Sequence, residues 1–152
     1  MSASSKLWPA IVVVALTGIL LLSGSSLNNI PIVENPYVPL GNIMTWLALI
    51  ALPWAIMQFY LLFKNIGRFL EVVYGLILRL AMIGGIAWPF LGRYLSGNWA
   101  NSFIGIPKES ALFWSYTRYL VITSFAILIL VLIQSLIQHF IFKRKEKKEP
   151  FY

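Results

Sequence analysis

Four long runs of apolar residues, separated by polar connections, dominate the hydrophobic pattern of the chain. A helix needs about 20 mostly apolar residues to cross the hydrocarbon core of a bilayer. The runs therefore predict four transmembrane helices, over residues 7–23, 43–63, 69–91 and 115–142, followed by a basic tail over 143–152. We expect an all-α integral membrane four-helix bundle in which residues 1–152 form a single transmembrane domain.

The first run is the shortest and follows Lys6, so a secretory signal peptide is an alternative to a retained helix. Signal peptides end in a small-x-small cleavage site, and the end of this run, Leu22-Ser23-Gly24, matches such a site poorly. We therefore expect the first run to remain as a transmembrane helix.

The connections predict how the helices are joined. The turn over residues 64–68 is short, which favours an antiparallel hairpin of the second and third helices. Residues 24–41 contain three prolines and three asparagines, which favour extended or turn structure. Pro107 suits the first turn of a helix, and Glu109 suits its positive end. The fourth helix is therefore expected to be long and to protrude beyond the membrane on the outer side, where it could contact a partner or simply extend into water.

Composition agrees with a membrane location. Hydrophobic residues make up 59% of the chain and charged residues 11%, whereas a soluble domain has about 25% charged residues. The net charge of +7 would suggest nucleic acid in a soluble protein. Here the basic residues flank apolar runs, so anionic lipid headgroups are the expected counter-charge and no nucleic-acid partner is predicted.

The distribution of basic residues predicts the orientation of the helices. One side of the membrane would receive eight of them and the other three: Lys6, Lys64, Arg68, Lys143, Arg144, Lys145, Lys147 and Lys148 against Arg93, Lys108 and Arg118. Because cytoplasmic loops are enriched in Lys and Arg, both termini are expected in the cytoplasm. The five basic residues of the tail are expected to act as an orientation signal at the lipid headgroups, with specific lipid or partner binding as the alternative.

The third helix carries most of the unusual residues inside the membrane. Gly67, Glu71, Gly75 and Arg79 recur every four residues and so share one stripe of a helix. Gly67 and Gly75 on this stripe, and Ala81 with Gly85 on another face, would allow close packing of neighbouring helices. The third helix is therefore expected to be the central packing element.

Depths counted from the cytoplasmic ends, at about 1.5 Å per residue, predict two layers of intramembrane polar residues. Arg79, Gln134 and Thr17 would share a level near mid-membrane, and a shallower layer would contain Glu71, Gln58, Gln138 and His139. For Arg79, a bond to Gln134, to backbone carbonyls or to a partner subunit is favoured over an anion, headgroup or quinone site and over a role in a channel. For Glu71, an ion pair with Arg68 is favoured over proton transfer.

His139 is the only histidine, and the chain has no cysteine. Axial ligation of a haem or chlorin, or proton transfer, is conceivable, so His139 is a weak candidate cofactor ligand, but a hydrogen-bonded histidine near the headgroups is the favoured interpretation. No metal site and no cofactor are predicted, and a bound lipid or quinone is left open.

The sequence contains no phosphate-binding glycine loop, nucleophile elbow or zinc-protease motif, and no catalytic residue is predicted. We expect a small non-catalytic accessory subunit of a larger membrane complex, with an energy-transducing complex among the options. One alternative is a small oligomeric transporter or channel that uses Arg79 and Glu71. A membrane enzyme or a lipid- or quinone-handling protein is the third. The expected partners are membrane lipids and other membrane subunits, or further copies of the chain.

Overall fold

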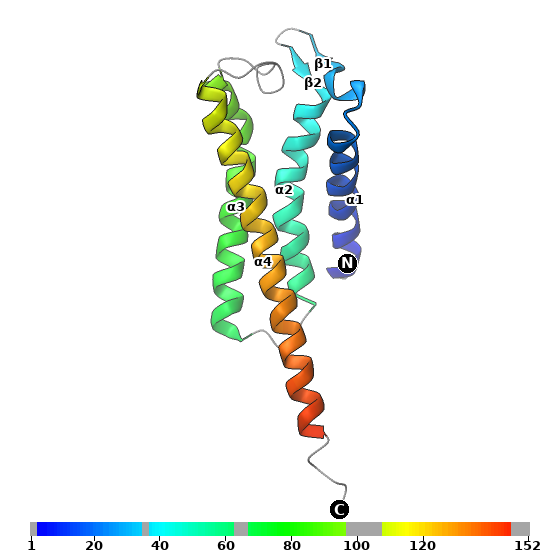
Figure 1. Cartoon of the computed structure of the whole chain (residues 1–152), viewed down its shortest axis with the longest axis vertical. Coiled ribbons are helices and arrows are strands. Elements are labelled where there is room, and N and C mark those ends of the chain that lie inside the picture. Colours follow the sequence, from blue (N-terminus) through cyan, green and yellow to red (C-terminus); the bar gives the residue numbers. More distant parts are fainter. Residues whose placement is uncertain (1–2, 35–36, 63–66, 97–107, 147–152) are drawn as a thin grey trace, which may run out of the picture.

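The computed structural model describes residues 3–34, 37–62, 67–96 and 108–146. It contains four helices that pack together, α1 (Ala3–Leu22), α2 (Leu40–Tyr60), α3 (Arg68–Ser96) and α4 (Lys108–Glu146), as Figure 1 shows. The fold is thus all-α, and the prediction of four packed helices with a long fourth is confirmed. At most of the predicted span ends, the observed helices extend one to seven residues farther.

Three of the helices are long and apolar enough to cross a membrane. The spans that qualify are Leu40–Tyr60, Arg68–Leu95 and Ala111–Ile141, of 21, 28 and 31 residues. In α1 the apolar stretch is shorter and covers Leu7–Leu22. The structure therefore indicates an integral multi-pass membrane protein.

The connection between α1 and α2 is built from turns and two short strands. After α1 the backbone turns at Gly24, whose φ of 60° lies in the left-handed region that favours glycine. A 3-10 helix η1 (Ser26–Asn29) follows, and strands β1 (Pro31–Val33) and β2 (Val38–Pro39) then pair antiparallel. The expected extended and turn structure in this segment is confirmed.

The central helix is α2, and the expectation that the third helix would be central is wrong. α2 packs against α1, α3 and α4, whereas α3 packs mainly on α2 and α4. Every residue of α2 except Leu47 is buried or half-buried, as is typical of a helix that is apolar on all sides and enclosed by neighbours. By contrast, α3 leaves one apolar face exposed.

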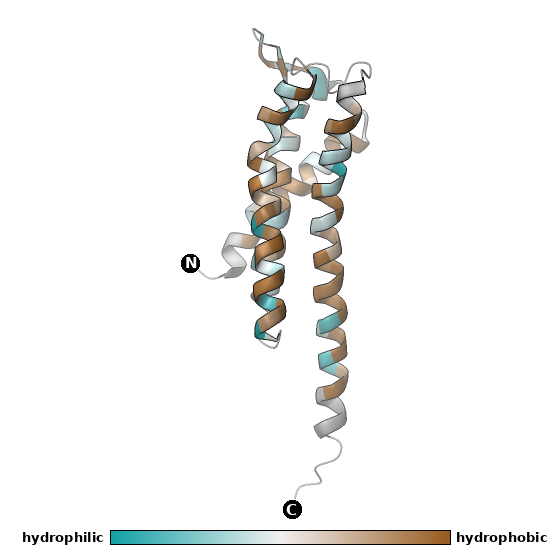
Figure 2. Cartoon of the chain, turned by 90° about the vertical axis from the view of Figure 1, so that its left-hand side faces the viewer, coloured by the Kyte–Doolittle hydropathy of each residue, from teal (hydrophilic) through white to brown (hydrophobic). Residues whose placement is uncertain are grey.

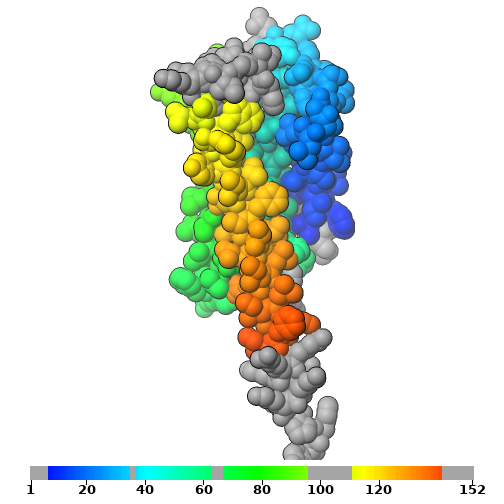
Figure 3. All heavy atoms as spheres, viewed as in Figure 1, coloured from blue at the N-terminus to red at the C-terminus, as the bar shows by residue number. Residues whose placement is uncertain are grey.

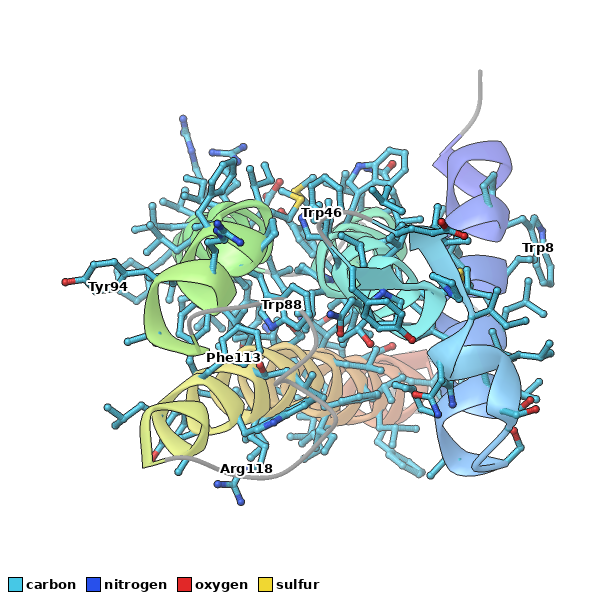
Figure 4. All side chains as sticks on the ribbon, turned by 90° about the horizontal axis from the view of Figure 1, so that it is seen from above. Trp8, Trp46, Trp88, Tyr94, Phe113 and Arg118 are labelled. Atoms are coloured by element: carbon cyan, nitrogen blue, oxygen red, sulfur yellow. The ribbon has the colours of Figure 1, made fainter. Side chains whose placement is uncertain are left out.

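The core consists of two clusters along the α2–α3–α4 interface. The larger cluster lies toward the end that carries the termini and comprises Leu52, Ile56, Tyr60, Tyr74, Leu78, Ile127 and Val131. The smaller comprises Leu49, Trp88 and Phe113, and Figure 4 shows Trp88 and Phe113 turned toward each other inside the bundle. Their ring centroids are 4.8 Å apart. Beside the smaller cluster, two hydrogen bonds join α3 and α4. Trp88 Nε1 donates to Thr117 Oγ1 at 2.8 Å, and the Tyr116 hydroxyl donates to the Gly84 carbonyl at 2.8 Å.

The long fourth helix protrudes at the end opposite to the one expected. Figure 1 shows that α4 begins beside the end of α3 and extends past the other helices at its carboxyl end. The buried side chains of α4 run from Phe113 to Val131, and beyond them Leu136, Phe140 and their apolar neighbours are exposed. The packing of Phe113 against Gly92 and Trp88 places the amino end of α4 beside the carboxyl end of α3. α4 therefore extends past the other helices at its carboxyl end, where the basic residues of this helix lie. We call this end of the bundle the basic end.

Candidate functional site

Arg79 and Glu71 lie on the outside of the bundle. Both side chains are exposed, and neither belongs to the apolar core between α2, α3 and α4. Arg79 lies about 16 Å along the helix from Arg68, the first residue of α3. A cationic side chain at this depth in a membrane needs a partner, because hydrocarbon neither solvates nor pairs its charge.

The surface around Arg79 is apolar. Figure 2 looks at the α3 side of the molecule and shows mostly hydrophobic positions interrupted by isolated hydrophilic ones. One row of exposed residues on this face follows a regular spacing of three and four positions: Phe69, Val72, Leu76, Arg79, Ile83, Ile86, Phe90 and Arg93. We call this row of eight residues the α3 seam. The seam contains two charged residues, Arg79 near its middle and Arg93 near the carboxyl end of the helix.

A tyrosine from α2 joins the stripe of Glu71, Gly75 and Arg79. The Tyr60 side chain is buried, and its hydroxyl oxygen would lie 3.0 Å from a Cβ atom added at Gly75. Gly75 therefore makes room for Tyr60 between the two charged residues. Sequence reasoning missed Tyr60, because a tyrosine near a span end is typical of the membrane interface and gives no sign of an interhelix contact.

The structure separates Arg79 from Gln134. Thr117 on α4 lies opposite Trp88 on α3, and the two helices are antiparallel. Counted from this pair toward the basic end, Gln134 on α4 and Glu71 on α3 are the same number of residues away. These two residues therefore lie at the same height along the bundle. Gln134 thus lies about 12 Å from the level of Arg79. The Gln134 Oε1 atom is buried without a hydrogen-bond partner, so the expected bond from Arg79 is not formed.

Thr17 also lies away from Arg79. Its hydroxyl contacts the Met44 carbonyl on α2 at 3.1 Å and the Val13 carbonyl on its own helix at 2.8 Å. Met44 is four residues after Leu40, the first residue of α2, so Thr17 is close to the end of the bundle where α2 begins. The expected mid-membrane layer of Arg79, Gln134 and Thr17 is therefore not present, because the four helices do not begin at a common level.

The remaining polar candidates differ in their exposure. His139 is exposed near the carboxyl end of α4, and Gln58 and Gln138 are half-buried. Within residues 3–34, 37–62, 67–96 and 108–146, no group of three or more His, Cys, Asp or Glu side chains could hold a metal ion. Lys143, Arg144 and Lys145 belong to the last turns of α4, while Lys147 and Lys148 lie outside the described residues.

Four small residues were expected to pack helices closely, and their surroundings differ. Gly85 has the closest contact, because an added Cβ would lie 2.9 Å from the Leu49 carbonyl oxygen. Ala81 is buried, and Gly75 accommodates Tyr60. Gly67 has no atom within 4 Å of an added Cβ. Among the three glycines, only Gly85 would bring an added Cβ against the backbone of α2.

Two apolar cavities lie between the helices. One, of about 390 Å³, is bounded by α1, α2 and α4, and its lining includes Ile11, Leu52 and Leu128. Figure 3 shows α2 visible there between α4 and α1. The other, of about 290 Å³, lies between α2 and α3 and is lined by Trp46 and Trp88, whose rings Figure 4 shows between these two helices. Neither of these two cavities is lined by Arg79 or His139.

Comparison with known proteins finds no matching family model, no matching curated protein and no matching solved structure.

Proposed function

We propose that the chain is a non-catalytic accessory subunit of a larger membrane complex, and that it contacts the complex through the α3 seam. The observation that carries this proposal is the exposure of Arg79 about 16 Å along α3 from Arg68, in an otherwise apolar face. An arginine facing lipid near the centre of a helix costs about 2.5–3.5 kcal/mol on insertion scales. Burial of the same side chain against another protein that accepts its hydrogen bonds removes most of this cost.

The orientation that we propose places both termini in the cytoplasm. Figure 1 shows the amino end of α1, the carboxyl end of α2, the amino end of α3 and the carboxyl end of α4 at the same end of the bundle. Lys6 and Arg68 belong to α1 and α3 at this end, and Lys143, Arg144 and Lys145 belong to the last turns of α4, while Lys64 precedes Arg68 in the sequence. The positive-inside rule assigns such an end to the cytoplasm. The protruding carboxyl end of α4 then points toward the cytoplasm.

The interior of the bundle argues against a channel formed by a lone chain. The larger core cluster fills the space between α2, α3 and α4 with apolar side chains and two tyrosines. Arg79 and Glu71 are exposed outside this interior. A polar path that uses these residues would have to lie between the chain and another protein, which again requires association.

Purification in a mild detergent from native membranes tests the proposal. We expect the tagged chain to migrate with at least one other membrane polypeptide in size-exclusion chromatography and native mass spectrometry. Arg79→Gln should weaken the association, whereas Arg93→Gln should not, because Arg93 is three residues from Ser96, the last residue of α3, and can reach the headgroups. Migration of the wild-type chain as a lone monomer would contradict the proposal.

A further inference from the structure

The α3 seam has the geometry of one half of a two-helix interface. Its eight residues are separated alternately by three and four positions, from Phe69 to Arg93. This spacing averages about 3.5 residues, which keeps a row of side chains facing a partner helix along a left-handed supercoil. All eight side chains are exposed in the chain, so no other described helix of the bundle covers the row. The seam is therefore long enough to seat one complete transmembrane helix.

We infer that the α3 seam seats a transmembrane helix of a different subunit, and that this helix carries an Asp or Glu carboxylate opposite Arg79. The inference rests on the proposed function and adds the chemistry of the partner. A single polar residue in an apolar seam fixes which partner binds and in which register, because every other register leaves the charge unpaired. A carboxylate is the side chain that both neutralises a guanidinium and accepts two of its hydrogen bonds.

The described residues of the chain itself do not supply this counter-charge. Glu71 is eight residues from Arg79 on the same helix, which corresponds to about 12 Å along α3. Tyr60 is buried beside Gly75, between the two, but its hydroxyl is neutral and offers a guanidinium only a hydrogen-bond acceptor. The α3 side chains beside Arg79 along the seam, Leu76 and Ile83, are apolar. Arg79 therefore has no anionic group at its own level on α3.

A second copy of the chain does not supply it either. Copies of one membrane protein with the same orientation are related by rotation about the membrane normal, so equal residues lie at equal depth. Two α3 seams packed on each other would bring Arg79 against Arg79, and like charges in a medium of low dielectric repel strongly. The lipid tails at this depth offer no hydrogen-bond acceptor. A different polypeptide with an acidic residue is the partner that remains.

Site-specific photo-crosslinking from native membranes tests this inference. A photoreactive residue at Leu76 or Ile83 flanks Arg79 on the seam, where the wild-type side chains are 55% and 61% exposed. Ile129 on α4 is a matched control, because it is an apolar residue that is 54% exposed on another helix. We expect positions 76 and 83 to crosslink to a transmembrane segment that has an Asp or Glu within one turn of the crosslinked residue. Position 129 should not yield that peptide.

The crosslinked peptides separate the two proposals. If positions 76 and 83 crosslink to a membrane protein whose segment has no acidic residue near the site, the acidic-partner inference fails and the accessory-subunit proposal stands. If they crosslink only to lipid or to a second copy of this chain, both fail.

Charge substitutions give an independent measurement on the same complex. Arg79→Lys should retain the partner, and Arg79→Gln should reduce its recovery about five- to thirtyfold, the range expected for the loss of one or two kcal/mol of interaction. Neutralising the partner's carboxylate should have a similar effect. Neutralising both should cost less than the sum of the two, because no unpaired charge is left. Additive losses would overturn the inference.

Discussion

The contact at Gly85 gives the sharpest test of how closely α2 and α3 approach. A Cβ atom added at Gly85 would lie 2.9 Å from the Leu49 carbonyl oxygen and 3.0 Å from the carbonyl carbon. Both are backbone atoms of a helix, so they cannot rotate away as the end of a side chain can. Gly85→Ala must therefore push the two helices apart over part of their length.

The expected cost follows from two opposing effects. Alanine is favoured over glycine in a helix by about 1 kcal/mol. Overpacking of a well-packed contact costs about 1–3 kcal/mol. Gly18 on α1 provides the matched control, because no atom lies within 4 Å of its added Cβ. Gly18→Ala gains the same propensity without the clash, so Gly85→Ala should be less stable than Gly18→Ala by about 1–3 kcal/mol.

The assay is reversible unfolding in mixed micelles, with SDS as the denaturant and near-UV circular dichroism of the tryptophans as the signal. Gly75→Ala is an informative third variant, because the atom it meets is the hydroxyl at the end of the Tyr60 side chain, at 3.0 Å. It should fall between the other two. Equal stability of Gly85→Ala and Gly18→Ala would refute the close approach of the two backbones.

Three other predictions follow from the structure and the sequence. Thr117→Val removes the acceptor of the Trp88 indole N–H and should destabilise the bundle by about 0.6–1.7 kcal/mol in the same titration; unchanged stability would mean that the bond contributes nothing. Gly24→Ala should cost about 1–2 kcal/mol because its φ of 60° is unfavourable for alanine, and a gain in stability would contradict that backbone conformation. The chain has no cysteine, so Asn65→Cys and Ser26→Cys give single labelling sites. A membrane-impermeant maleimide should label position 65 only from the cytoplasmic side and position 26 only from the outer side; labelling of both from one side would reject the proposed orientation.

The sequence predicted the number of helices and the nature of the connection between the first two for a simple reason. A helix that crosses hydrocarbon has a required length and a required composition, and both are visible in one dimension. The prolines between Gly24 and Gly41 likewise act locally on the backbone, so their effect could be anticipated. These features depend on each segment by itself.

The levels of the helices relative to one another could not be predicted. They depend on which side chains meet across an interface, such as Phe113 beside Gly92 or Thr117 beside Trp88. Depths counted from span ends assumed that all four helices begin at one plane. The protruding carboxyl end of α4 breaks this assumption, and for that reason Gln134 is level with Glu71 instead of Arg79.

The sequence also could not show which face of each helix is buried in the bundle and which is exposed. In a soluble protein the polar side of a helix marks its exposed face, but in a membrane protein both the interior and the lipid-facing surface are apolar. Apolar pattern alone therefore could not identify α2 as the central helix. The regular spacing of the α3 seam is present in the sequence, yet it indicates an unoccupied interface only once the other faces of α3 are known to be covered by α2 and α4.

Arg79 and Arg93 show why exposure must be interpreted together with depth. Both belong to the α3 seam and both are exposed in the chain. Arg93 is three residues from Ser96, the end of α3, so its long side chain can reach water and headgroups, and its charge requires nothing further. Arg79 lies about 16 Å from Arg68 at one end of α3 and about 26 Å from Ser96 at the other, so lipid tails surround it unless a protein does. The same residue type on the same face thus needs no protein partner near the end of the helix and needs one farther inside, and this difference is the physical basis for assigning the α3 seam to another subunit.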